Sequence, residues 1–175
     1  MLTLCGIQIA LSSSSFLMLL YQHQNVHVRR YKWVSRDTLP SDFDAIAPDS
    51  EENSYTYKWP NRWCEDVEND AVVFEGYLKF PRAGTWTIFA KSDDDLRLFI
   101  DGNPVLTVDG KIVVRDVGKA VIEVAPGFTF KHVRIEFLEL CRGNRLDMQW
   151  ARPGVSKTDI PRGVWVVGSG NNRKN

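Results

Sequence analysis

This 175-residue sequence has few cysteines, few histidines and no net charge. It has three Cys and three His, and its 22 Lys and Arg balance its 22 Asp and Glu. A nucleic-acid-binding protein usually carries a basic excess or stripe, so the zero net charge argues against that class. Cys5, Cys64 and Cys141 include no Cys-x-x-Cys pair, and no zinc site is indicated. Buried or free thiols and a Cys64–Cys141 bridge in an exported chain both remain open.

Recognisable catalytic motifs are also absent from the sequence. His23, His27 and His132 are dispersed, and none belongs to a His-Glu-x-x-His pair. There is no Gly-x-Ser-x-Gly elbow, phosphate-binding loop or dinucleotide fingerprint. Because no nucleophile, base and orienting group can be assembled, we expect a protein without catalytic machinery of its own. A glycosidase pair of carboxylates stays open, since Asp and Glu are abundant but nothing places two of them across a cleft.

The first part of the chain is free of charged side chains up to Arg29. Residues 1–15 are predicted to be a signal or anchor segment, either cleaved near the Ser12–Ser15 run or retained in a membrane. The alternative is that Phe16–Tyr21 forms the first buried strand. An export segment predicts an extracellular or cell-surface protein that meets a membrane only through this anchor. Residues 168–175, rich in Gly and Asn and basic, are predicted to be a flexible tail.

From position 71 to position 150, apolar residues recur at every second place in short runs separated by turn residues. The alternation is clear in residues 71–80, where Val72, Phe74 and Leu78 share one parity, as expected of a half-buried strand. Asp-Gly pairs at positions 101 and 109 are typical of tight turns. The pattern predicts an all-β protein, an antiparallel β-sandwich over residues 16–167 with little helix.

Residues 36–70 lack this rhythm. They are polar, and we expect them to form long loops over the sandwich with one isolated strand at Tyr55–Trp59. Just before them, Arg29, Arg30 and Lys32 form a small basic cluster. We interpret that cluster as a solvated strand edge, where charge discourages aggregation.

One long block of the sequence is more specific than a strand pattern. From Phe74 to Gly102 it consists of an aromatic strand, Pro-Arg-Ala-Gly, a second aromatic strand, Ser-Asp-Asp, and a strand ending in Ile-Asp-Gly. This order resembles the centre of the protective-antigen (PA14) domain family. Leu146–Trp150 and Ile160-Pro161 are similar to the closing strand and exit of that family. The resemblance implies a lectin-like β-sandwich of the kind found in toxins, glycosidase insertions and fungal adhesins.

Three adjacent carboxylates, Asp93, Asp94 and Asp95, separate two expected strands. Neighbouring carboxylates repel one another unless solvent or a cation neutralises them, and oxygen ligands of this type suit Ca²⁺. The resemblance implies the same ion, because lectin-like family members hold Ca²⁺ with an adjacent Asp pair that matches Asp93 and Asp94. The other interpretation is a polar turn whose carboxylates accept hydrogen bonds from backbone N–H groups.

The resemblance also implies ligands from the loop between the last two long strands. Glu139 matches the place of an amide side chain in the lectins, and Cys141 matches the place of a backbone carbonyl. A carboxylate at Glu139 is compatible with Ca²⁺ but departs from the sugar-binding pattern. Asp95 is a second departure, because many members have Gly there, and it either adds a ligand or faces solvent.

Residues that contact sugar are expected around this turn. Loops near residues 59–66, with Trp63, are expected to select the glycan, and Asp95, Arg142 and Asn144 are further ligand-binding candidates. Trp59, Trp63 and Trp165 can stack on sugar rings, or they can serve as core and loop-anchoring aromatics.

The function expected from these features is that of a non-catalytic adhesion module that binds glycans or glycoproteins with the help of calcium. Two alternatives remain open. One is a structural or protein-interaction sandwich without a sugar site, and the other is an accessory module of a larger glycosidase or toxin.

Overall fold

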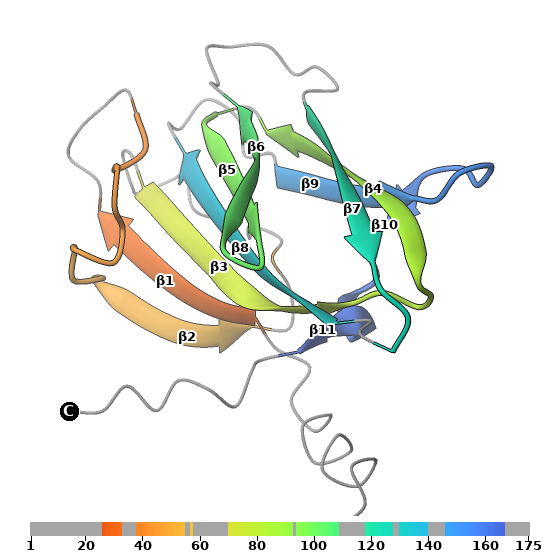
Figure 1. Ribbon diagram of the computed structural model, residues 1–175. Coiled ribbons are helices and arrows are strands. Elements are labelled where there is room, and N and C mark those ends of the chain that lie inside the picture. The colour runs from red at the N-terminus through yellow and green to blue at the C-terminus, as the bar shows by residue number, and fades with distance from the viewer. Residues whose placement is uncertain are drawn as a thin grey trace, which may run out of the picture.

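The computed structural model describes residues 26–32, 38–54, 57, 70–92, 94–108, 118–127, 130–139 and 146–166, with only the backbone at Glu139. These residues form a sandwich of two antiparallel β-sheets (Figure 1). The larger sheet has the order β2-β1-β3-β8-β5-β6, with β11 pairing with β3, and the smaller sheet has the order β10-β9-β4-β7. The predicted all-β antiparallel sandwich is confirmed.

The bounds of the strands follow the turn residues of the sequence. The larger sheet contains β1 (Val26–Lys32), β2 (Ser50–Ser54), β3 (Asp70–Lys79), β5 (Leu96–Ile100), β6 (Asn103–Val108), β8 (Phe130–Glu139) and β11 (Trp165–Val166). The smaller sheet contains β4 (Gly84–Ser92), β7 (Gly118–Val124), β9 (Leu146–Ala151) and β10 (Thr158–Asp159). A short 3₁₀ turn, η3 (Arg162–Val164), precedes β11.

The main hydrophobic core lies between the sheets and is built by the period-two alternation of the strands. In β5, Leu96, Leu98 and Ile100 are buried and belong to this core. From the smaller sheet, Trp86 and Trp150 contribute rings whose centroids lie 4.9 Å apart. This packing is the large apolar burial that stabilises the sandwich.

The outer face of the larger sheet carries a second, smaller core. Residues 38–49, which we call the covering segment, bring Phe43 onto this face, where its side chain is 0% exposed. The rings of Phe43 and Tyr31 of β1 have centroids 4.9 Å apart. The other buried members of this core are Ala71, Val73 and Leu138. The first half of β3 is therefore buried on both faces, which explains its continuous apolar run.

Two expectations for the N-terminal part of the chain are wrong. The polar residues Ser50–Ser54, expected in a loop, form β2 and pair with β1. Because β2 is the outer neighbour, β1 is not an edge strand. Of the basic cluster, Lys32 is exposed as expected, whereas Arg29 is only 5% exposed instead of solvated. Within the strand predicted at Tyr55–Trp59, Tyr57 is a bend, and its four companions lie outside the described residues.

The Asp-Gly turn predicted at position 101 is confirmed. Asp101 has a positive φ of 50° and Gly102 one of 78°. The Asp101 carboxylate accepts hydrogen bonds from Lys131 Nζ at 2.7 Å and from the backbone N–H of His132 at 3.0 Å. This aspartate therefore shapes a turn and fastens it to β8. The predicted leader, the Phe16–Tyr21 strand, the tail and all three cysteines lie outside the described residues.

Candidate functional site

The acidic turn lies at one end of the sandwich, between β4 and β5 (Figure 1). Its backbone is tied to both neighbouring elements. Ser92 Oγ donates to the carbonyl oxygen of Asp94 at 2.6 Å, and the N–H of Leu138 in β8 donates to the carbonyl oxygen of Asp95 at 3.0 Å. Asp94 is 7% exposed, whereas Asp95 is half-buried. Asp93 lies outside the described residues.

The register of the larger sheet brings Glu139 next to this turn. Leu96 pairs with Phe137, so continuing the antiparallel register by two residues sets Asp94 opposite Glu139. The hydrogen bond from the N–H of Leu138 to the carbonyl oxygen of Asp95 shows that this register extends beyond β5 as far as Asp95. Because alternate residues of a strand share a face, the Asp94 and Glu139 positions lie on the face that carries the core residues Leu96 and Phe137.

A third carboxylate, which no motif in the sequence marks, completes this row. Asp70, the first residue of β3, pairs with Glu139 and is 8% exposed. Burial raises the pKa of the Asp70 carboxyl, an effect that the nearby charges of Lys32 and Arg30 partly offset. Within the described part of the chain, Asp70 Oδ1 has no hydrogen-bond partner. Asp70, Glu139 and Asp94 thus occupy successive positions across three neighbouring chain segments at the rim.

The predicted metal ligands can be placed only in part. Asp94 and the backbone of Glu139 lie at the same end of the sheet, whereas Asp93 and Cys141 fall outside the described residues. Among the residues whose side chains are described, no three His, Cys, Asp or Glu gather as a metal site would require. Carboxylate oxygens are the donors that Ca²⁺ prefers, so the residues that are present fit that ion in type.

The predicted sugar-contacting residues have mixed outcomes. Trp63, Arg142 and Asn144 lie outside the described residues, as does Trp59. Trp165 is fully buried and packs against Tyr57 with ring centroids 5.4 Å apart. A buried indole cannot stack on a sugar ring, so the core interpretation of Trp165 is the correct one.

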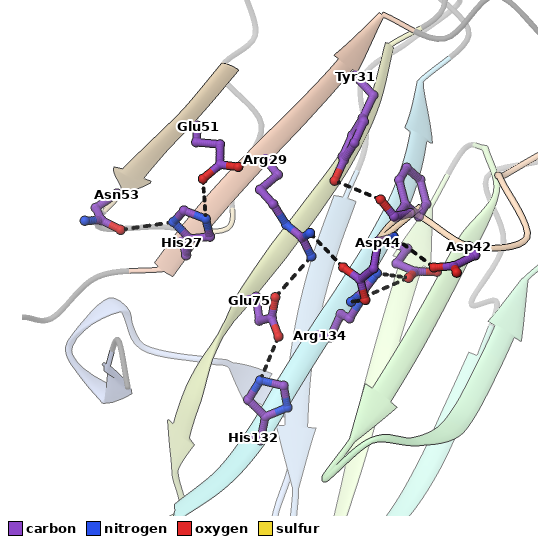
Figure 2. Close-up of polar contacts among 12 residues, drawn as sticks. His27, Arg29, Tyr31, Asp42, Asp44, Glu51, Asn53, Glu75, His132 and Arg134 are labelled. Carbon is purple, nitrogen blue, oxygen red and sulfur yellow. Dashed lines mark hydrogen bonds and ion pairs between the residues drawn. The ribbon is translucent and has the colours of Figure 1, made fainter. Parts of the chain in front are cut away.

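A chain of ion pairs crosses the outer face of the larger sheet at the covering segment (Figure 2). Asp44 of that segment binds two arginines at 2.8 Å, Arg29 of β1 through one carboxylate oxygen and Arg134 of β8 through the other. Arg29 also pairs with Glu75 of β3 at 3.2 Å. Glu75 Oε1 in turn lies 3.1 Å from His132 Nε2. A single carboxylate in the covering segment therefore bridges two strands that are not neighbours.

The network continues to β5 through a buried carboxylate. Glu136 of β8 pairs with Arg134 at 2.8 Å and with Arg97 at 2.6 Å. Arg97 also donates to the carbonyl oxygen of Pro40, which is a second attachment of the covering segment. Removing ions from water costs much of what their attraction returns, so we expect this network to specify where the segment lies more than to add stability.

The two carboxylates that face Arg29 stay ionised. Burial would raise the pKa of the Asp44 carboxyl, but the hydrogen bonds and charges of Arg29 and Arg134 outweigh it and hold that pKa below its usual range. The pKa of Glu75 is lowered, first by its hydrogen bond with His132 and then, against the effect of burial, by Arg29. Ionised carboxylates at these positions hold the arginines of β1 and β8 in place.

A family model described as the PA14 domain matches residues 31–163. The chain belongs to the PA14 domain family. None of the curated proteins matches it. Within the described ranges, this PA14 domain has no helix with the length and hydropathy needed to cross a membrane.

Solved structures of other proteins share the fold at low sequence identity. The PA14 domain of the antifreeze protein MpAFP has a TM-score of 0.61 and 16% identity, covering 82% of this chain and 90% of that one. The PA14 sugar-binding domain of an RTX adhesin has a TM-score of 0.64 and 13% identity, covering 83% and 99%. The epithelial adhesin 9 A domain of Candida glabrata, in complex with Galβ1-4GlcNAc, has a TM-score of 0.62 and 9% identity, covering 84% and 91%. These similarities show the fold alone.

Proposed function

We propose that this PA14 domain is a non-catalytic carbohydrate-binding module of the cell exterior in which Ca²⁺ assists sugar binding. The carboxylates of Asp93, Asp94 and Glu139 and the carbonyl oxygen of Cys141 would hold the ion. When bound, Ca²⁺ supplies positive charge and open coordination positions suited to sugar hydroxyls. Two structures of similar fold support a sugar ligand, since one is described as a sugar-binding domain and the other contains a disaccharide.

The observation that carries the proposal is the row of acidic positions at one rim of the sandwich. Asp94 and Asp70 are both buried there, and the register sets Glu139 between them. Like charges so close together destabilise one another, and a cation is the simplest way to offset that repulsion. Asp95, Trp63, Arg142 and Asn144 would contact the glycan around the ion and set its selectivity.

Calcium binding is tested by thermal melting of the wild type and of Asp94→Asn, with and without Ca²⁺. At a Ca²⁺ concentration about 100 times Kd, binding contributes about 2.7 kcal/mol, which raises Tm by about 5–10 °C in a domain of this size. Asp94→Asn should lose this rise. The matched control is Glu123→Gln, which removes an exposed carboxylate from β7 and should keep the rise.

Glycan binding is tested on an array with Ca²⁺ and with a chelator. Neutral glycans should be retained by the wild type and Glu123→Gln in Ca²⁺ only, and by Asp94→Asn in neither condition. Equal retention with and without chelator would contradict the role of calcium.

One observation favours a second candidate, a structural sandwich whose acidic turn binds no cation. Ser92 Oγ and the N–H of Leu138 hold the turn through hydrogen bonds to its backbone carbonyls. In that case Ca²⁺ leaves Tm unchanged and no array glycan is retained. An accessory role in a larger enzyme is a third candidate, because a similar fold makes up 14% of the chain of an α-xylosidase from Xanthomonas citri.

A further inference from the structure

A pocket lies on the outer face of the smaller sheet, away from the core between the sheets. Its volume is about 350 Å³, and its lining comes from β4, β7 and β9 together with the loop before β10. Phe89 of β4 stands at its centre, because the register sets Lys119 of β7 on one side of it and Gln149 of β9 on the other. The volume is at the small end of the range for ligand pockets, about 300–1,000 Å³.

The pocket has an excess of positive charge. Its lining includes three lysines, Lys91, Lys119 and Lys157, and one carboxylate, Asp147. Lys91 and Asp147 are direct cross-strand partners, so their charges offset each other. The Asp159 carboxylate also lies beside the pocket, because it accepts a hydrogen bond from Gln149 of the lining. Three lysines then face two carboxylates, so the pocket has an excess of one positive charge, although the protein as a whole has zero net charge.

The contacts inside the pocket hold its polar groups near an aromatic ring. Lys157 Nζ lies 5.3 Å from the centroid of the half-buried Phe89 ring, within the range of a cation–π contact. The Gln149 amide donates to Asp159 at 2.9 Å, which fixes the orientation of that side chain. An apolar floor with a few oriented polar groups is the usual composition of a small-molecule site.

We propose that this pocket, which we call the basic pocket, binds an acidic sugar unit, one that carries a carboxylate or sulfate, within a polysaccharide. The anion pairs with Lys119 and Lys157, the apolar face of the sugar ring lies against Phe89, and Gln149 contacts a hydroxyl. The basic pocket is separate from the acidic turn and needs no cation. A nucleic acid is the less fitting anion, because its recognition uses an extended basic surface and a single excess positive charge does not form one.

The test measures binding in the presence of a chelator, which removes any contribution of Ca²⁺ bound at the acidic turn. Polygalacturonate, a sulfated glycosaminoglycan, neutral dextran and single-stranded DNA are each titrated into the wild-type domain at low salt. The variants are the double substitution Lys119→Ala with Lys157→Ala, and Phe89→Ala. The matched control is Lys79→Ala, which removes a lysine that lies 5.9 Å from the ring of Phe130, in the other sheet.

The wild type and Lys79→Ala should bind one or both acidic polysaccharides and neither dextran nor DNA. The double lysine variant should bind them about tenfold more weakly, and added salt should weaken wild-type binding, because exposed charge pairs are screened. Phe89→Ala should also weaken binding. Asp94→Asn changes only the acidic turn and should leave this binding unchanged.

Three results would overturn the proposal. The first is that the wild type binds neither acidic polysaccharide. The second is that Lys79→Ala loses as much polysaccharide affinity as the double lysine variant. The third is that DNA binds as tightly as the polysaccharide. Retention of acidic polysaccharide by Asp94→Asn in chelator would support the basic pocket even if the calcium proposal fails.

Discussion

Truncating Phe43 tests whether the covering segment is part of the fold or only rests on it. Phe43→Ala removes a ring that is fully buried on the outer face of the larger sheet, against Tyr31. Buried Phe→Ala substitutions cost about 3–5 kcal/mol, the lower end applying where the surroundings can collapse into the space. Phe43 belongs to a loop segment, which can relax, so we expect about 3 kcal/mol.

That loss converts into a measurable melting shift. For a domain of 150–250 residues, each kcal/mol changes Tm by about 2–4 °C, so Phe43→Ala should melt about 6–12 °C below the wild type. Urea unfolding should show a lower midpoint with an unchanged slope. Val121→Ala is the control, because that side chain is 63% exposed on β7 and its loss should cost less than about 0.5 kcal/mol. The reasoning is refuted if Phe43→Ala melts within about 2 °C of the wild type.

Two further predictions concern the ion network and the contact between the sheets. Asp44→Asn should cost about 1 kcal/mol at neutral pH, a value discounted because this carboxylate is about half exposed. The pKa of Asp44 is lowered in the folded state, so its contribution to the free energy of unfolding is present above the usual Asp range and is lost as pH falls through the lowered pKa. The melting curves of the variant and the wild type should therefore converge in acid. A difference in Tm that persists in acid would contradict the ion-pair account. At Gly118 an added Cβ would lie 2.4 Å from Leu106 Cδ1, so Gly118→Ala should cost about 1 kcal/mol, and less in a Leu106→Ala background. Strictly additive losses in the double variant would mean that this contact does not limit the approach of β6 and β7.

The acidic turn, proposed to bind Ca²⁺, and the basic pocket, proposed to bind an acidic sugar, are two candidate binding surfaces of opposite charge. One depends on carboxylates crowded at the rim, and the other on lysines set around an aromatic ring on a sheet face. The two are separable by experiment, because a chelator acts on the first and added salt acts on the second. A glycan that carries both vicinal hydroxyls and an acidic group offers chemistry for both.

Much of the fold was predictable because the strand period is local. The alternation in Leu96–Ile100 and in residues 71–80 indicates which side chains share a face, and the PA14 resemblance located the acidic turn between two strands. The Asp-Gly pair at position 101 has the turn geometry that its residue types favour. By contrast Ser50–Ser54, which is wholly polar, carries no strand signal and becomes β2 only because it pairs with β1.

Only the tertiary structure shows that the covering segment packs on the outer face of the larger sheet. The period of two places Arg29, Glu75 and Arg134 on the face opposite the main core, and from the sequence such a charged face is expected to meet water. The covering segment shields part of that face. Phe43 packs in the second core, and Asp44 binds Arg29 and Arg134, which lie 15 and 90 residues away in the sequence. The alternation of apolar and polar residues indicates to which face of the sheet each side chain of a strand points. It does not indicate which distant segment folds over that strand.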